Sequence, residues 1–255
     1  MYGAIIGDLA GSIYEYDQFQ KVGKIKMNKL IEENSFYSDD TILTIAILDA
    51  ILNDRNYNKF LREYIKKYSK YKPNSKPYFD TIFSPNLIKW SEHNNQGNSH
   101  GNGAMMRISS IGYMFNNEQE IIDNVKKATI PSHNSKEAIE SATKIALIIY
   151  YLRNKISLDT IYKKLNIKLK YEPITRFNYT CEETIDNCLY VLYNSKSFED
   201  AIKKAVELGG DTDTNACIVG SMAEALYGIN DELINKANDK IPEEFKKVLQ
   251  KSNYR

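Results

Sequence analysis

The chain has 255 residues, of which 42% are hydrophobic and 26% are charged, with a formal net charge of +1 at pH 7. These values are ordinary for a soluble globular protein, and the near-zero net charge gives no electrostatic case for nucleic acid or acidic membranes. Three cysteines without Cys-x-x-Cys spacing argue against a disulfide framework, so we expect a cytoplasmic protein, and we expect a monomer.

The first predicted helix covers Tyr2–Ser12 and is short, apolar and rich in glycine. Glycine recurs every four residues, which places these positions on one helix face where another backbone can approach closely: Gly3, Gly7 and Gly11. The stretch has no basic start and its apolar run is interrupted by Asp8, so it is not a signal peptide. No apolar run in the sequence is long enough to span a bilayer.

A polar segment follows this first helix. We expect Asp8 to bond to nearby backbone and Glu15 to lie just past the helix end. Residues 17–36 read as an irregular loop that could form a lid.

The next helix begins with acidic residues. Ser38-Asp39-Asp40-Thr41 precedes an apolar run over 42–52, which predicts a buried helix. Ser38 is a natural N-cap. Adjacent Asp39 and Asp40 repel each other and cannot both act as that cap.

The middle of the chain is predicted to be helical, with one polar loop. Helices are expected at Tyr57–Tyr71, Asn86–His93, Ala104–Phe115, Glu118–Ala128, Ser135–Leu152 and Ser157–Leu165, with a loop over Lys72–Pro77. The glycine-rich stretch over 94–103 opens onto one of these helices, an arrangement that can bind an anion. Arg107 is either a phosphate ligand or part of a structural ion pair, and His133 either donates to phosphate or ribose oxygens or is structural.

The last third is also helical, apart from Ile167–Thr180, which is the least readable part. Helices are expected at Cys181–Tyr193 and Phe198–Leu208, with one or two more within Asp231–Gln250. No run alternates with the period of a strand. We therefore predict an all-α fold of about a dozen helices in a single domain, 1–255.

A second acidic helix start lies within Glu207–Tyr227. Gly209 and Gly210 allow a tight turn, and two carboxylates and two hydroxyls then precede a buried helix over 216–226: Asp211, Thr212, Asp213 and Thr214. Helix capping explains one such residue but not four. We expect the two acidic starts to lie side by side in one core, where their carboxylates must shift their pKa values or hold cations. Oxygen ligands favour Mg²⁺, then Mn²⁺ or Ca²⁺.

The two acidic starts resemble the paired motifs of the ADP-ribosylglycohydrolases, the family of dinitrogenase-reductase-activating glycohydrolase and the ADP-ribosyl-acceptor hydrolases. The resemblance covers most of the chain. It includes three further segments: Gly7–Glu15, Gly101–Arg107 and Ser132–Asn134.

This resemblance implies a metal-dependent hydrolase that cleaves ADP-ribose from a protein or small-molecule acceptor. It implies two Mg²⁺ ions, with Mn²⁺ as the alternative, held by Ser38, Asp39, Asp40, Asp211, Asp213 and Thr214. Glu15 is implied as the catalytic base, with Asp40 and Asp211 as the other candidates. ADP-ribose would lie over Gly101, Asn102, Gly103, Ala104 and Met105, with His133 beside it.

Other functions remain open at this point. The alternative is a catalytically silent binder of ADP-ribose or a structural member of the same fold. A His-Asp phosphohydrolase is disfavoured because no histidine precedes an aspartate, and a terpene-synthase-like site lacks an aspartate at Leu43. Three positions depart from the family pattern: Ser38, Met105 and Ser110. Arginine, serine, a nucleic-acid base or a metabolite could be the acceptor, with arginine expected first.

Overall fold

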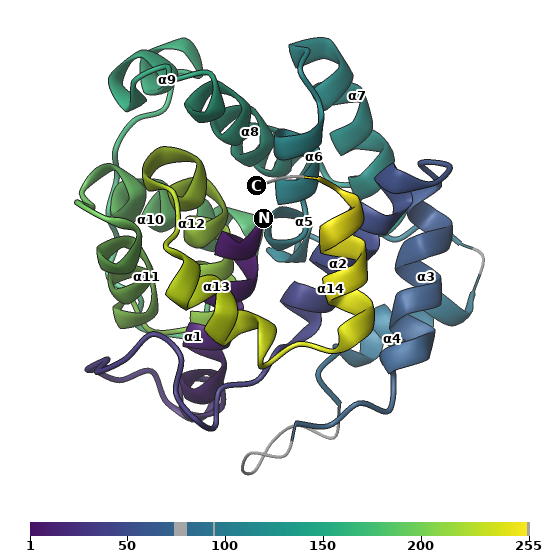
Figure 1. Cartoon of the computed structure of the whole chain (residues 1–255), viewed down its shortest axis with the longest axis horizontal. Coiled ribbons are helices and arrows are strands. Elements are labelled where there is room, and N and C mark those ends of the chain that lie inside the picture. The colour runs from purple at the N-terminus through teal and green to yellow at the C-terminus, as the bar shows by residue number, and fades with distance from the viewer. Residues whose placement is uncertain (74–80, 94, 254–255) are drawn as a thin grey trace.

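The helices α1 (Tyr2–Gln20) and α12 (Thr212–Tyr227) lie side by side at the centre of the fold, as Figure 1 shows. The computed structural model describes residues 1–73, 81–93 and 95–253. A Cβ atom at Gly3 would lie 2.1 Å from the Gly220 carbonyl oxygen, and one at Gly7 would lie 2.1 Å from the Ala216 carbonyl oxygen. Only glycine permits this backbone contact, so the predicted glycine face of the first helix is confirmed.

The described residues form fourteen helices and no strand, with only two isolated bridges. The all-α prediction is confirmed. Around the central pair lie α2 (Asp39–Leu52), α3 (Tyr57–Tyr68), α4 (Pro85–Glu92), α5 (Gly103–Met106), α6 (Ser109–Met114), α7 (Glu118–Thr129), α8 (Lys136–Arg153), α9 (Leu158–Lys164), α10 (Cys181–Tyr193), α11 (Phe198–Glu207), α13 (Asp231–Asn238) and α14 (Glu243–Lys251).

Two predicted helix boundaries are wrong in ways that affect the site. The first helix continues to Gln20, so Glu15 lies within it rather than past its end. Its last turn is held by Gln18, whose side-chain oxygen accepts from the N–H groups of Gly23 at 3.1 Å and Gly210 at 3.2 Å. This tertiary contact extends the helix beyond its apolar part.

The helix predicted over Ala104–Phe115 is in fact two helices, α5 and α6. The break follows Met106, whose carbonyl oxygen accepts from Thr44 Oγ1 at 3.3 Å and from Cys217 Sγ at 3.4 Å. Because the carbonyl bonds to neighbouring helices, the α-helical ladder is interrupted there.

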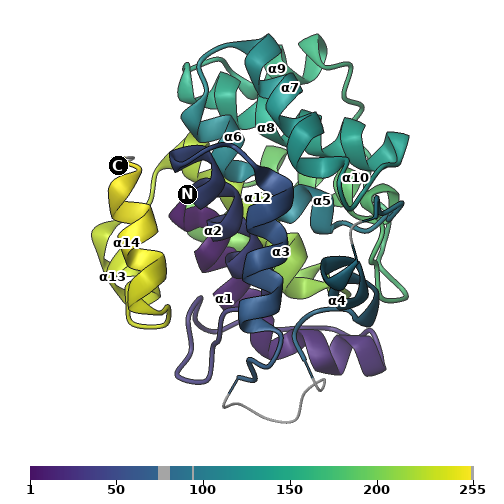
Figure 2. The same ribbon diagram turned by 90° about the vertical axis from the view of Figure 1, so that its right-hand side faces the viewer.

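The C-terminal region forms two helices, and Pro242 separates them at the N-cap of α14. In Figure 2, α13 and α14 lie together on one side of the molecule. Phe245 of α14 packs against the rings of Tyr37, Tyr64 and Tyr68.

Most of the loop predicted over Lys72–Pro77 lies outside the described residues.

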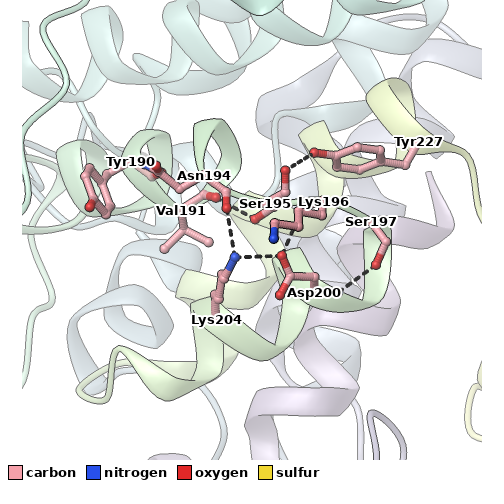
Figure 3. Close-up of polar contacts among 9 residues, drawn as sticks. All are labelled: Tyr190, Val191, Asn194, Ser195, Lys196, Ser197, Asp200, Lys204 and Tyr227. Atoms are coloured by element: carbon pink, nitrogen blue, oxygen red, sulfur yellow. Dashed lines mark hydrogen bonds and ion pairs between the residues drawn. The ribbon is translucent and has the colours of Figure 1, made fainter.

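A polar network at the surface joins the ends of α10, α11 and α12, as Figure 3 shows. Lys204 Nζ donates to the Asn194 carbonyl oxygen at 2.8 Å and to Asp200 Oδ2 at 2.6 Å. The Tyr227 hydroxyl donates to the Ser195 carbonyl oxygen at 2.6 Å. These contacts fix the C-terminal end of α12 against the α10–α11 turn.

No helix in the described part of the chain is long and apolar enough to cross a membrane.

Candidate functional site

The N-terminus of α2 is anchored by a carboxylate of α1. Asp8 Oδ2 accepts from the Ser38 N–H at 2.9 Å, the Thr41 N–H at 3.1 Å and the Thr41 hydroxyl at 2.5 Å. Asp8 does bond to backbone, as expected, but its partners lie 30 and 33 residues away rather than nearby. Ser38 caps the helix by accepting from the Asp40 N–H at 3.2 Å.

The N-terminus of α12 begins at a tight turn. Gly209 and Gly210 have φ values of 78° and 69°, a conformation that glycine adopts without steric cost. Asp211 makes no side-chain cap bond. Its Oδ2 instead accepts from Asn102 Nδ2 at 2.8 Å, so capping does not account for this aspartate.

The two acidic starts meet in the interior. Thr214 Oγ1 of α12 donates to Asp40 Oδ2 of α2 at 3.2 Å. The expectation that the two helix starts lie side by side is therefore confirmed.

Glu15 of α1 joins the same acidic cluster. One carboxylate oxygen from each of Glu15, Asp211 and Asp213 lies within 4.8 Å of the other two. Glu15 is partly buried, whereas both aspartates are buried. The acidic cluster thus consists of six carboxylates: Asp8, Glu15, Asp39, Asp40, Asp211 and Asp213.

Burial and mutual repulsion raise the pKa of every carboxyl group in the acidic cluster. Burial, followed by the charge of Asp213, raises the pKa of Asp8 to about 7. The same two causes hold the pKa values of Glu15, Asp39 and Asp40 well above their usual range. Burial raises the pKa of Asp213 as well, and its neighbour Asp211 adds to the shift.

The acidic cluster has the composition of a site for hard cations. No lysine or arginine of the described residues forms an ion pair with any of the six carboxylates. Asp8 Oδ1 and Asp40 Oδ1 are buried without a hydrogen-bond partner. Buried charge without compensation is costly, and an all-oxygen donor set suits Mg²⁺ or Mn²⁺. The residues present therefore fit a divalent metal.

The glycine-rich loop lies next to this cluster because Asn102 connects the two. Ala104 and Met105 are fully buried, and their N–H groups already donate to the carbonyl oxygens of Gly101 at 3.3 Å and Asn102 at 2.8 Å. The Gly103 N–H has no partner among the described residues. The N–H groups of Ala104 and Met105 are thus less available for binding ADP-ribose than the sequence indicated.

Arg107 is fully buried behind the loop. Its Nη2 donates to Ser132 Oγ at 2.7 Å and to the Ala128 carbonyl oxygen at 3.3 Å, and it lies 3.4 Å from His133 Nδ1. Its Nε and Nη1 have no partner. Burial lowers the pKa of Arg107 to about 10. In the part of the chain that is described, it forms no ion pair, so the ion-pair reading of Arg107 is wrong. Its side chain is fully buried, and its role as a phosphate ligand stays a prediction.

A polar hub that the sequence did not reveal holds the acidic turn in place. Asn178 Oδ1 accepts from the Asp211 N–H at 2.9 Å, and its Nδ2 donates to Thr184 Oγ1 at 2.9 Å and Asn215 Oδ1 at 3.0 Å. Its carbonyl oxygen accepts from Asn102 Nδ2 at 3.3 Å. Asn178 lies in the segment that was least readable, and nothing local distinguishes it from a solvated asparagine.

The sequence profile of the ADP-ribosylglycohydrolase family matches residues 1–254. A putative ADP-ribosyl glycohydrolase, L543 of Acanthamoeba polyphaga mimivirus, is 24% identical over 88% of this chain and 84% of its own length. The ADP-ribosylarginine hydrolase Tri1 of Serratia proteamaculans is 22% identical over 89% and 70%. Human ADP-ribosylhydrolase ARH3 is 21% identical over 89% and 84%. A solved structure named as an ADP-ribosylglycohydrolase-related protein complex shares the fold, with a TM-score of 0.66, 17% identity, and coverage of 98% of this chain and 93% of that one.

Proposed function

The chain belongs to the ADP-ribosylglycohydrolase family, and from that premise we propose that it hydrolyses the glycosidic bond between ADP-ribose and its acceptor. The observation that carries this proposal is the meeting of two acidic helix starts with Glu15 in one largely buried cluster. Such a cluster can bind cations and present a carboxylate to water in the same place.

Two divalent ions, Mg²⁺ or Mn²⁺, are the proposed cofactors. Their ligands would be oxygen atoms of Ser38, Asp39, Asp40, Asp211, Asp213 and Thr214. The unpartnered Asp40 Oδ1 and the absence of ion pairs at the described carboxylates support this assignment. When bound, such ions supply positive charge that orients ribose hydroxyls and lowers the pKa of water.

Glu15 is the proposed general base. Its pKa is raised well above the usual range, first by burial and then by Asp213 and Asp211, and perturbed carboxylates of this kind are typical of catalytic positions. It projects from α1, whereas the proposed ligands come from the starts of α2 and α12. Asp40 and Asp211 are the other candidates for the base. A base here would take a proton from water while the sugar acquires oxocarbenium character.

The glycine-rich loop is the proposed binding site for the diphosphate of ADP-ribose. The unpartnered Gly103 N–H supports a direct contact. The nearest atoms to a Cβ atom at Gly103 would be His133 Nε2 and Met106 Cε at 3.6 Å and Met106 Sδ at 3.8 Å, which is ordinary van der Waals contact, so Gly103→Val should fold. We expect it to weaken ADP-ribose binding in calorimetry. Unchanged affinity would place the diphosphate elsewhere.

Arginine-linked ADP-ribose on protein is the proposed substrate, supported by the name of the Tri1 relative. The test is a mass-spectrometric assay of ADP-ribosylated arginine, serine and nucleic-acid substrates, with Mg²⁺ and with EDTA. We expect release of ADP-ribose from arginine with Mg²⁺ and none with EDTA. Binding of ADP-ribose without release from any substrate would favour the catalytically silent alternative. A monomeric, cytoplasmic protein stays a prediction. So does a lid, although the loop predicted over 17–36 begins only after Gln20, where α1 ends.

A further inference from the structure

His133 lies between a buried cation and the glycine-rich loop. Its Nδ1 is 2.8 Å from Ser132 Oγ and 3.4 Å from Arg107 Nη2, and Arg107 Nη2 is itself 2.7 Å from Ser132 Oγ. All three side chains are buried. Their hydrogens therefore have to find acceptors among neighbouring protein groups without help from bulk water.

Only one arrangement of these hydrogens gives the Ser132 hydroxyl hydrogen an acceptor and keeps two donors from facing each other. A guanidinium only donates hydrogen bonds, so Ser132 Oγ accepts from Arg107. The hydroxyl hydrogen of Ser132 then has His133 Nδ1 as its acceptor. The opposite tautomer would leave that hydroxyl hydrogen without a described partner and would place the Nδ1–H against the Arg107 N–H.

The protonated form of His133 is also disfavoured. Burial, followed by the charges of Arg107 and His100, holds the pKa of His133 well below its usual range. An imidazolium would add a second buried cation beside a guanidinium that already has two unpartnered nitrogens, Nε and Nη1.

The other ring nitrogen faces the loop. A Cβ atom at Gly101 would lie 3.5 Å from His133 Nε2, and one at Gly103 would lie 3.6 Å from it. Nε2 has no hydrogen-bond partner among the described residues. A side chain that is 5% exposed thus directs an unused polar atom at the gap that two glycines leave.

We propose that Arg107 and Ser132 are positioning residues that hold His133 as the neutral Nε2–H tautomer. The Nε2–H is then a fixed donor for an oxygen atom of a ligand bound over Gly101–Gly103. The identity of that ligand as ADP-ribose rests on the proposed function, whereas the tautomer does not.

The tautomer is measurable in the unmodified protein by ¹⁵N NMR of the imidazole rings at neutral pH. The chain has three histidines, and His93 is an internal contrast because its Nδ1 lies 2.7 Å from the Lys89 carbonyl oxygen. A carbonyl only accepts, so neutral His93 carries its hydrogen on Nδ1 and His133 carries its hydrogen on Nε2. A hydrogen on Nδ1 of His133, or on both nitrogens, would overturn the inference.

Ser132→Ala tests the positioning role, with Ser132→Thr as the matched control that keeps the hydroxyl. We expect Ser132→Ala to show a second His133 tautomer and about fivefold weaker ADP-ribose binding, the scale of one hydrogen bond. Ser132→Thr should show a single tautomer and near-normal affinity. An unchanged tautomer and affinity in Ser132→Ala would refute positioning by Ser132. The measurement on the unmodified protein decides the tautomer even if a variant fails to fold.

ADP-ribose itself separates the two levels of the proposal. Adding it should shift the ¹⁵Nε2 resonance of His133 more than its ¹⁵Nδ1 resonance. An Nε2–H tautomer in a protein that does not bind ADP-ribose would support the hydrogen-bond assignment and overturn the proposed function. Binding without a change at Nε2 would support the proposed function and overturn the assigned donor role.

Discussion

The two ends of α12 carry charge in opposite ways. At the N-terminal end, Asp211 and Asp213 are buried beside four other carboxylates, and none forms an ion pair within the described residues. At the C-terminal end, the network around Tyr227 contains Lys204 and Asp200, paired at 2.6 Å with 38% and 32% of their side chains exposed. One end holds uncompensated charge in the interior, whereas the other holds compensated charge at the surface.

This difference indicates which end can do chemistry. A surface ion pair contributes roughly 0–1 kcal/mol and changes little else. Buried carboxylates without counter-ions destabilise the fold unless protons or cations neutralise them, although the helix dipole offsets part of that cost. A cation bound at the N-terminal end of α12 would therefore stabilise the fold more than one bound at the C-terminal end.

The largest expected effect is on catalysis by Glu15. Glu15→Gln keeps the shape of the side chain and removes its basic oxygen, so kcat should fall roughly a hundredfold to ten-thousandfold. KM and metal affinity should change little, provided substrate binding is at equilibrium. Steady-state kinetics and calorimetry check both. A near-normal kcat would move the base to Asp211 or Asp40, and a loss of metal would make Glu15 a ligand.

Asp213→Asn should act first on the metal. It removes one charge from the acidic cluster at nearly constant shape, and we expect metal affinity to fall by about a hundredfold or more, since even outer partners of metal sites contribute 10–100-fold. Activity should fall with it and recover in part at high Mn²⁺ concentration. Calorimetry with Mg²⁺ or Mn²⁺ measures the loss, and retained affinity would exclude Asp213 from the ligand set.

The free energy of unfolding should depend on pH through the acidic cluster at the N-terminal end of α12. Asp8 has a folded pKa of about 7 and an unfolded value of about 4. The stability that protonated Asp8 contributes to the fold is therefore fully present below about pH 4 and is lost as the pH rises through about 7. The other raised carboxyl groups of the cluster act in the same direction.

A bound divalent metal should restore the stability that the folded protein loses as the pH rises. At pH 8 and a Mg²⁺ concentration a hundred times its Kd, we expect Tm to rise by about 5–10 °C, with a much smaller gain at pH 5. Differential scanning calorimetry of metal-stripped protein provides the measurement. An equal gain at both pH values, or none, would contradict a cation site built from these carboxylates.

The smallest effect is expected at the surface end. Lys204→Met removes the contacts of Nζ with Asp200 and Asn194 and keeps the apolar stem. The free energy of unfolding should fall by less than about 1 kcal/mol, with metal affinity and kcat/KM unchanged. Denaturant unfolding and steady-state kinetics test this. A large loss of activity would show that the two ends of α12 are coupled.

Much of the fold follows from local chemistry that the sequence displays. Ser38, Ser135 and Ser197 cap α2, α8 and α11 as hydroxyl caps do in general. The glycine spacing in α1 predicts a close approach by another backbone, and the structure shows that this backbone is α12. The convergence of the two acidic starts was predicted because two buried helices of one core were expected to bring their ends together.

The packing of distant segments determined the remaining features. Asp8 bonds to a group 30 residues away, Arg107 to one 21 residues away and Asn178 to one 33 residues away, and no local pattern marks such pairs. The break after Met106 arises from hydrogen bonds to two other helices.

The sequence by itself determined where most helices begin, which faces are apolar and which residues carry acid. Those properties depend on neighbours within one or two helical turns. Only the tertiary structure decided which oxygens are left unpartnered, which nitrogen of His133 faces the loop, and that Glu15 belongs to the cluster. These features depend on which polar groups are buried together. The free-energy cost of burying those groups is set by all the elements that surround them.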